Sequence, residues 1–320
     1  MPNRSEPVAV ITPRLLRDWA LPVPVGGKDA RGTVLVVGGS RFTPGAVLLA
    51  GVAALRAGAG VLQLAVAEST AAALSIAVPE ALVAGLPETP GGSVAATAIT
   101  AASTDKAAGG GKGSEGAADR PRADRLAELA AEAGVIAAGP GLDDVEETSG
   151  LLKGLLAAAG PETVFVLDAY ALGALSREPD LLRDHGRTAV LTPNLTEARF
   201  LLGHDLDDDL DDAAAEIAVK YDAVVSLYGH IASRPSSGGV VRRWREETAD
   251  TGLGTSGSGD VRAGILAGLI SRGATPEQAA CWAAWAHATA GQRLVPGHGR
   301  IGFLARELLD EISPALAVLQ

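Results

Sequence analysis

The chain has 320 residues, 47% of them hydrophobic but only 3% aromatic, so it can bury a large and mainly aliphatic core. Its formal net charge of −11 excludes the broad basic surface that nucleic acids and anionic membranes attract. Cys281 is the single cysteine, which excludes an intramolecular disulfide framework and indicates a reducing compartment. The sequence has neither a signal peptide nor a run of about 20 apolar residues, so we expect a cytoplasmic protein that binds no membrane.

The first part of the chain predicts a βαβ unit that follows an N-terminal arm, residues 1–31, interrupted by prolines. Gly32–Ser40 holds a run of branched or aliphatic residues and ends in Gly-Gly-Ser, which is typical of a buried parallel strand that runs into a loop. Ala46–Ala57 is rich in alanine and leucine and predicts a helix, and Val61–Val66 predicts a second strand. The loop Gly38–Gly45 therefore lies at the carboxyl end of a strand, where ligands usually bind.

A polar segment interrupts this pattern. Glu68–Ala77 predicts a helix and Ala81–Leu86 a strand, but residues 103–124 are rich in glycine, alanine and charged side chains. This segment has too little apolar surface to offset the entropy of ordering it. We expect a disordered surface insertion within one domain that spans residues 1–320, because the same alternation of elements resumes after it.

The second part of the chain repeats strand, polar or glycine-rich loop, and helix. The predicted strands are Val135–Ala138, Thr163–Leu167, Thr188–Leu191 and Asp222–Leu227, with Gly239–Arg245 as a strand of a local hairpin. The predicted helices are Leu126–Ala133, Ser149–Ala159, Asp260–Arg272, Pro276–Leu294 and Gly302–Glu311. This alternation predicts an α/β fold of three layers, with helices on both faces of a doubly wound, mostly parallel sheet.

Two charged stretches of the sequence are expected to have no catalytic or binding role. The acidic run Asp205–Asp212 predicts a solvated loop and the start of a helix, because aspartate is favoured near a helix N-terminus. Arg242, Arg243 and Arg245 are expected to be surface charges.

The glycine-rich stretch Gly252–Asp260 carries the chemistry. Its glycines let the backbone approach a ligand closely, and the helix that follows offers unpaired N–H groups to a phosphate. Asp260 begins this helix, so its carboxylate would face the same space and take a proton from a substrate hydroxyl. A simple helix cap would need only one flexible position, whereas this stretch has several glycines. An anion site beside a base is typical of phosphoryl transfer, so we interpret the stretch in that way.

Four loops at strand ends would converge on one edge of the sheet and form a single crevice. They are Gly38–Gly45, Gly139–Asp143, Thr192–Glu197 and Gly252–Asp260.

These segments together resemble the ADP- or ATP-dependent NAD(P)H-hydrate dehydratases of the ribokinase-like superfamily. The resemblance extends over nearly the whole chain and rests on Lys28 and Val34–Ser40 with Gly45 and Ala46, Ala53–Gly60, Ala138–Leu142, Val166–Leu172, Leu191–Pro193 with Glu197, Gly257–Val261 with Ala263 and Gly264, and His287 with Ala290 and Gly291.

The resemblance implies a substrate, a cofactor and a set of contacts. The substrate would be hydrated NADH or NADPH, and ADP or ATP would drive the removal of water. Asp260 would be the base on the ring hydroxyl, and positions that match Ala46 and Gly141 would also contact the hydrate. The nucleotide would bind the N–H groups of Gly257, Ser258 and Gly259 and the strand exit at Tyr228, Gly229 and His230.

Three positions depart from the family pattern. Asn194 takes the place of a histidine expected at the hydrate, and with Glu197 it forms Asn-x-x-Glu, which resembles a magnesium-organising motif of ribokinase-like kinases. Tyr228 takes the place of a lysine, so that cation near the phosphates is missing, and His230 is a candidate replacement. Leu253–Thr255 fits the family's small-residue run only loosely. His287, in the middle of an alanine-rich helix, is expected to be a packed structural residue.

The sequence leaves alternatives open. Asn194 and Glu197 with the same Asp260 chemistry also fit an ATP-dependent small-molecule kinase, and Tyr228 with Asn194 fits a nucleotide-binding homologue without turnover. The resemblance implies Mg²⁺ beside the nucleotide, a homo-oligomer (tetramer or dimer), and a separate epimerase, because no epimerase segment precedes the predicted fold in this sequence.

Overall fold

The computed structural model describes residues 7–99, 122–249 and 251–320. Most of the predicted insertion, residues 103–121, lies outside the described part. Its last three positions do not fit the prediction of disorder, because α4 begins at Arg122 and runs to Glu132.

A single sheet organises the described residues, and its ten strands stand in the order β1-β10-β9-β8-β7-β6-β5-β2-β3-β4. The strands are β1 Ala9–Val10, β2 Thr33–Val37, β3 Val61–Ala67, β4 Ala81–Leu86, β5 Val135–Ala138, β6 Val164–Leu167, β7 Thr188–Leu191, β8 Val224–Leu227, β9 His230–Ala232 and β10 Arg243–Arg245. Every neighbouring pair of these strands is parallel except the two pairs that contain β9. The order reverses between β2 and β5, which makes the sheet doubly wound as predicted.

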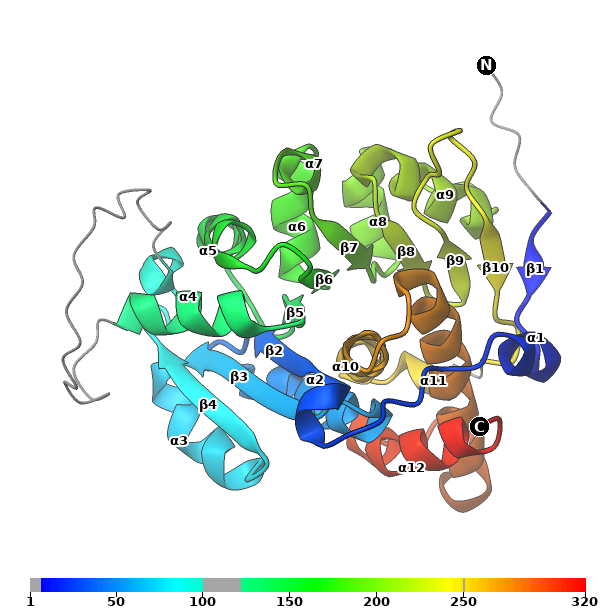
Figure 1. Ribbon diagram of the computed structural model, residues 1–320, viewed down its shortest axis with the longest axis horizontal. Coiled ribbons are helices and arrows are strands. Elements are labelled where there is room, and N and C mark those ends of the chain that lie inside the picture. The colour runs from blue at the N-terminus through cyan, green and yellow to red at the C-terminus, as the bar shows by residue number, and fades with distance from the viewer. Residues whose placement is uncertain (1–6, 100–121, 250) are drawn as a thin grey trace.

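Helices cover both faces of this sheet (Figure 1). They are α1 Pro13–Asp18, α2 Pro44–Ala57, α3 Glu68–Ala77, α4 Arg122–Glu132, α5 Val145–Ala158, α6 Tyr170–Arg177, α7 Leu181–Asp184, α8 Leu195–Leu202, α9 Leu210–Tyr221, α10 Ser258–Ser271, α11 Pro276–His298 and α12 Ala305–Ala317. One core lies between the sheet and α4, α5, α6, α8 and α9, and the other lies between the sheet and α2, α10, α11 and α12. The central strands face a core on both sides, which is why they consist of almost uninterrupted aliphatic residues.

Helix α10 sits deep in the second layer, and two of its glycines fix how close it comes to α2. A Cβ atom added at Gly264 would lie 2.1 Å from the carbonyl oxygen of Ala50, and one added at Gly268 would lie 2.3 Å from that of Ala54. Such contacts are impossible for any other residue, so the two helix backbones pack at a distance that only glycine allows. This contact fixes the N-terminus of α10 relative to the sheet.

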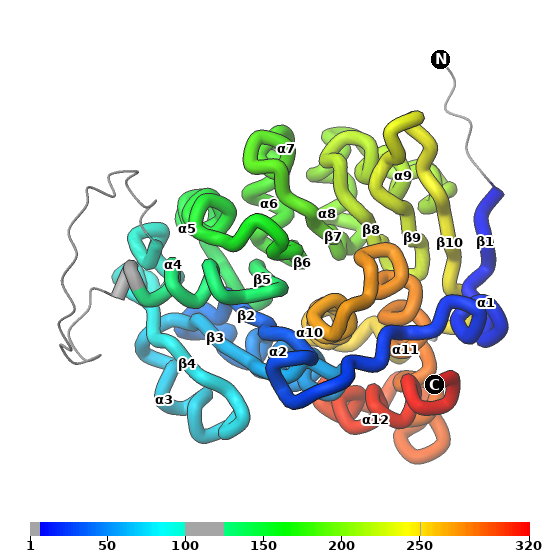
Figure 2. Tube along the Cα trace, viewed as in Figure 1, coloured from blue at the N-terminus to red at the C-terminus, as the bar shows by residue number. Residues whose placement is uncertain are grey.

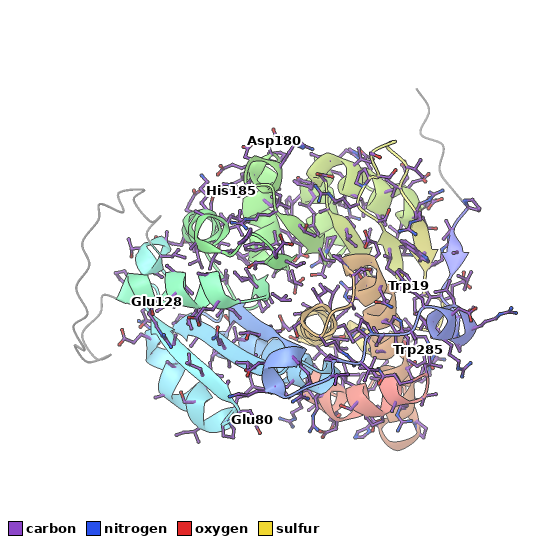
Figure 3. The ribbon with its side chains drawn as sticks, viewed as in Figure 1. Trp19, Glu80, Glu128, Asp180, His185 and Trp285 are labelled. Atoms are coloured by element: carbon purple, nitrogen blue, oxygen red, sulfur yellow. The ribbon has the colours of Figure 1, made fainter. Side chains whose placement is uncertain are left out.

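The N-terminal arm is more ordered than the sequence predicted. Strand β1 adds to the sheet edge beside β10, although the two are more than 200 residues apart along the chain (Figure 2). Trp19, which ends α1, packs against Trp244 with ring centroids 5.9 Å apart, and its carbonyl accepts a hydrogen bond from Trp282 Nε1 at 2.9 Å. Figure 3 shows Trp19 close to α11, where the arm meets the C-terminal helices. Contacts with β10 and α11 therefore order the arm.

The acidic run and the arginines of β10 also differ from the prediction. Asp211 is buried at 2% exposure, and its carboxylate accepts hydrogen bonds from His230 Nδ1 at 2.6 Å and from Arg245. Although burial alone would raise the pKa of Asp211, these two partners hold it below its ordinary value. We call Asp211, His230 and Arg245 the Asp211 ion cluster. Arg243 likewise pairs with Asp212 and is only partly exposed, so the run and the arginines bind one another across α9 and β10.

Candidate functional site

A cleft of about 570 Å³ opens at the carboxyl ends of β6, β7 and β8, opposite the N-terminus of α10. This volume is in the range of small-molecule sites. Its lining comprises Asp168, Ala169, Thr192, Asn194, Glu197, Tyr228, Gly229, Glu246, Ala249, Thr251, Leu253, Gly254, Thr255, Gly257, Ser258, Gly259, Asp260, Arg262, Ala284 and His287. Two of the four predicted loops, Thr192–Glu197 and Gly252–Asp260, line this cleft at the carboxyl edge of the sheet, whereas Gly38–Gly45 and Gly139–Asp143 do not.

The first turn of α10 forms one wall of the cleft. Gly257 precedes the helix with φ +88°, a left-handed conformation that favours glycine, and Asp260 lies in the first turn. A Cβ atom added at Gly259 would meet no heavy atom within 4 Å, so the backbone there faces open space. The first N–H groups of a helix lack intrahelical acceptors and favour an anion. The structure thus brings together the glycine-rich turn and Asp260, as the sequence predicted.

Asp260 shares the cleft with Asp168 and Glu197, and we call the three side chains the cleft carboxylates. Burial raises the pKa of Asp168 and of Glu197. Burial, followed by the negative charges of Asp168 and Glu197, raises the pKa of Asp260 to about 7. A carboxyl group with this pKa can accept and release a proton near neutral pH, which suits a general base.

Asn194 and Glu197 form a capping box at the start of α8. Asn194 Oδ1 accepts hydrogen bonds from the N–H groups of Thr196 and Glu197, both at 2.9 Å, and the Asn194 N–H donates to Glu197 Oε2 at 2.9 Å. The local backbone therefore occupies one oxygen of each side chain. The Asn-x-x-Glu pattern has a sufficient structural explanation, although both residues line the cleft.

A divalent cation would find oxygen ligands here without a closed protein cage. Mg²⁺ usually keeps several waters and is bound by one or two carboxylates plus phosphate oxygens of the substrate. Asp168 Oδ1 accepts a hydrogen bond from Thr192 Oγ1 at 2.7 Å, so Asp168 and Glu197 each use one oxygen in the fold. Within the described residues, no three His, Cys, Asp or Glu side chains are grouped closely enough to hold a metal by themselves. The site fits a magnesium ion that arrives with a nucleotide.

Arg262 is a residue of the cleft that the sequence interpretation overlooked. It follows Asp260 by two positions on α10, is only 6% exposed, and donates through Nη2 to the carbonyl of Thr192 at 3.3 Å. Its guanidinium carbon lies 5.8 Å from the centroid of the Tyr228 ring. Position 228 lacks the lysine of the family, but the guanidinium of Arg262 places a positive charge beside it. The only signal in the sequence was a charged residue inside an otherwise apolar helix pattern.

His287 lies at the base of the cleft on α11 and has a structural partner. Its Nε2 is 2.9 Å from Ser258 Oγ, and its side chain is 8% exposed. Burial and the positive charge of Arg262 lower the pKa of His287 to about 3, so the ring is neutral at neutral pH. It holds Ser258 at the first turn of α10, which agrees with the expected structural role.

Two residues in the cleft adopt backbone conformations that are uncommon without glycine. Ala169, after β6, has φ +48°, and Tyr228, after β8, has φ +51°. Strained residues of this kind concentrate at ligand sites, because only the surrounding fold maintains them. Tyr228 and Gly229 thus line the cleft as predicted. His230 does not, because its ring binds Asp211.

Ala46 and Gly141 also stand outside the cleft lining. The loops after β2 and β5 bind each other instead: the N–H of Ser40 and the hydroxyl of Thr43 both donate to the carbonyl of Gly141, at 2.8 and 2.7 Å. A Cβ atom at Gly141 would lie 2.4 Å from the carbonyl oxygen of Thr43 and 3.0 Å from the Ala46 Cβ. Their contact with a substrate stays a prediction.

The acidic and histidine residues labelled at the edge of Figure 3, Glu80, Glu128, Asp180 and His185, do not line the cleft. Asp168 and Thr192, like Arg262, do line it; Thr192 belongs to the predicted crevice loop Thr192–Glu197 but was given no role, and Asp168 was not among the predicted site residues. Both immediately follow strands that the sequence placed correctly, so their position at a strand end was the available signal.

Comparison with known proteins points to one family. The family model described as NAD(P)H-hydrate dehydratase matches residues 34–314. The chain is 41% identical to the ADP-dependent (S)-NAD(P)H-hydrate dehydratase of Xanthomonas campestris pv. campestris, over 95% of each protein. It is 35% identical to the bifunctional NAD(P)H-hydrate repair enzyme of Moorella thermoacetica, over 92% of this chain and 51% of that one. The chain therefore spans about half the length of that bifunctional relative.

Solved structures agree with the predicted ribokinase-like fold. The ADP/ATP-dependent NAD(P)H-hydrate dehydratase of Bacillus subtilis, co-crystallized with ATP/Mg²⁺, matches with a TM-score of 0.74 and 23% identity, over 98% of this chain and 99% of that one. A ribokinase-like superfamily protein of Enterococcus faecalis matches with a TM-score of 0.71 and 18% identity, over 98% and 96%. None of the helices in the described ranges has the length and apolar character needed to span a membrane.

Proposed function

The chain belongs to the NAD(P)H-hydrate dehydratase family, and from this premise we propose that it removes water from hydrated NADH or NADPH at the expense of a nucleotide. The observation that carries the proposal is the position of Asp260. Its carboxyl group, with a pKa raised to about 7, faces the same cleft as the exposed backbone at Gly259. One site can therefore hold a phosphate and deprotonate a hydroxyl.

Asp260 would act on the hydroxyl group of the hydrated ring. It accepts the hydroxyl proton while the oxygen attacks the terminal phosphoryl group of the nucleotide, and the bond from that phosphorus to the nucleotide leaving oxygen breaks. The ring carries a phosphate ester after this step. Loss of that phosphate together with a proton from the neighbouring ring carbon forms the double bond of the dihydronicotinamide. The N–H groups of Gly257–Gly259 would bind the transferred phosphoryl group.

We propose ADP as the nucleotide, supported by the relatives from Xanthomonas campestris and Neisseria meningitidis, whose names specify ADP dependence. The nucleotide would extend toward Tyr228 and Gly229, which line the cleft at the end of β8. Asp168 and Glu197 would hold a magnesium ion that neutralises phosphate charge, with Asn194 keeping Glu197 in place through the capping box. Ala46 and Gly141 would border the hydrated ring.

A kinase is the alternative that the test must separate. Its main ground in the sequence was the pair Asn194 and Glu197, and the hydrogen bonds of the capping box account for that pattern. The purified protein is incubated with hydrated NADPH and either ADP or ATP, and the absorbance of the dihydronicotinamide is followed. Its return with release of phosphate supports the dehydratase. A phosphorylated product that accumulates without restored absorbance supports the kinase. If neither the absorbance nor a phosphorylated product appears, the result supports a binding protein without turnover.

The cellular setting follows from the same proposal. The bifunctional relatives are named as repair enzymes, so we propose that a separate epimerase converts the other epimer of the hydrate. A homo-oligomer and a cytoplasmic location complete the proposal, and the buried free thiol of Cys281 is compatible with a reducing compartment.

A further inference from the structure

Arg262 holds a charge in the cleft without the partners that a buried guanidinium ordinarily has. Its side chain is 6% exposed, and its Nε atom is buried without a hydrogen-bond partner among the described residues. The hydrogen bond to the Thr192 carbonyl at 3.3 Å uses one of five N–H donors. Burying an unsatisfied charged group is costly unless a ligand completes it.

The helix directs this side chain toward the phosphate-binding turn. Arg262 lies four positions after Ser258, so the two residues share one face of α10. Long side chains on a helix point back toward its N-terminus. Ser258 and Arg262 both line the cleft, so the guanidinium and the first N–H groups of α10 border the same space.

The surrounding charges do not satisfy Arg262 as an ion pair. Burial lowers the pKa of Arg262, and the negative charges of Asp168 and Glu197 only partly oppose this effect. The hydrogen bond found for its guanidinium among the described residues goes to the backbone carbonyl of Thr192, not to a carboxylate. The Tyr228 ring covers it from the direction of β8, with 5.8 Å between the guanidinium carbon and the ring centroid. The ring stabilises a cation and fixes its orientation, but it supplies no anionic acceptor.

We propose that Arg262 binds a phosphate group of the ligand in the cleft, with Tyr228 holding the guanidinium in position. The fork of N–H donors fits two phosphate oxygens at once, which a lysine ammonium does not. The inference rests on the proposed function for the identity of the ligand, which presents either the diphosphate of ADP or the diphosphate of the dinucleotide. It explains why the exit of β8 can do without a lysine.

Titration calorimetry with ADP, inorganic pyrophosphate and adenosine tests the proposal. Arg262→Leu should weaken ADP and pyrophosphate binding about 10- to 100-fold, the range for a lost charge-assisted hydrogen bond, and leave adenosine binding unchanged. Arg242→Leu is the matched control, because Arg242 also lies over an aromatic ring, 5.3 Å from the Trp244 centroid, but outside the cleft. Its affinities should equal those of the unmodified protein.

The proposal is overturned if Arg262→Leu binds ADP, pyrophosphate and NADPH all as the unmodified protein does, or if adenosine binding falls by the same factor as ADP binding. The second result would mean that Arg262 only maintains the shape of the cleft. Should Arg262→Leu fail to fold, Arg262→Lys decides, because it keeps the charge but loses the fork. A several-fold weaker affinity for ADP or for NADPH is expected, and unchanged affinities for both ligands contradict the proposal.

The same variants separate this inference from the dehydratase proposal. A titration with NADPH in place of ADP identifies which diphosphate Arg262 contacts, because only the contacted ligand loses affinity. If the unmodified protein restores dihydronicotinamide but Arg262→Leu changes neither affinity, the function stands and the inference fails. If turnover is absent but Arg262→Leu still binds pyrophosphate more weakly than the unmodified protein, the inference stands and the function fails.

Discussion

The cleft and the Asp211 ion cluster both bury carboxylates near an arginine, yet their electrostatics are opposite. In the ion cluster, His230 and Arg245 hydrogen-bond both oxygens of Asp211, and its pKa is lowered. In the cleft, the pKa of every one of the cleft carboxylates is raised, and the Arg262 guanidinium donates to the backbone carbonyl of Thr192.

The difference lies in geometry, because both regions contain the same residue types. Strands β9 and β10 and helix α9 place Asp211 directly against His230 and Arg245, so the carboxylate has two ion-pair partners when the chain folds. The strand ends around the cleft hold their charges apart, at the edge of an open space. A folded chain maintains unsatisfied charge where a ligand completes it, and such shifts concentrate at functional sites.

Replacing the base should give the largest effect. Asp260→Asn removes the proton acceptor and should lower kcat for dehydration about 10²- to 10⁴-fold, with little change in nucleotide affinity. In the unmodified enzyme, kcat should rise as the pH passes about 7, since Asp260 must be ionised to act. Steady-state assays across pH check both expectations. Asp310→Asn, at an exposed ion pair with Arg56, is the control and should leave kcat unchanged.

Breaking the ion cluster should affect stability instead of turnover. Asp211→Asn leaves His230 and Arg245 without their carboxylate, and we expect the free energy of unfolding to fall by about 1–3 kcal/mol. Arg245 is partly exposed and can regain water, which keeps the loss below that of a fully buried pair. Urea denaturation measures the change. A large loss of kcat with unchanged stability would place the cluster in the active site and contradict our comparison.

The two regions should also respond oppositely to pH. The pKa of Asp260 is raised from 3.8 to about 7, so its contribution to stability is present below its unfolded value and disappears as the pH rises through about 7. The pKa of Asp211 is lowered, so its contribution is present above 3.8 and disappears as the pH falls through the folded value. Denaturation across pH should show Asp260→Asn altering the neutral part of the curve and Asp211→Asn the acidic part.

The smallest effect should come from the neutral hydrogen bond under the cleft. Ser258→Ala removes the bond to His287 and should cost about 1 kcal/mol of unfolding free energy, typical of one uncharged hydrogen bond. Thermal denaturation measures it. A more stable variant would contradict this expectation and would show that the contact between Ser258 and His287 is strained.

Much of the molecule could be predicted from local patterns. The aliphatic runs at β2, β3 and β5–β8 predicted their strands, because a strand buried on both faces needs apolar residues throughout. The glycines before Asp260 predicted the turn that opens α10, because the left-handed backbone at Gly257 is a local requirement. Strand β1 was missed, since two residues carry no periodicity and their pairing with β10 comes from the far end of the chain.

The site was predicted less completely. Asn194 and Glu197 fit two interpretations by spacing alone, and only the hydrogen bonds revealed the capping box. His230 follows Gly229 directly, yet strand alternation turns its ring to Asp211 and away from the cleft. Arg262 received no interpretation from the sequence, because its contact with the Tyr228 ring depends on the fold.

By itself the sequence determined the order of the elements, the doubly wound arrangement, and the glycine-rich turn with Asp260, because these depend on short-range periodicity and backbone freedom. The tertiary structure alone decided which charges are satisfied and which are left facing the cleft. Burial sets the pKa of Asp260 and of Arg262, together with the charges of Asp168 after β6 and Glu197 on α8. Those neighbours are distant in sequence, so no local pattern encodes their distances.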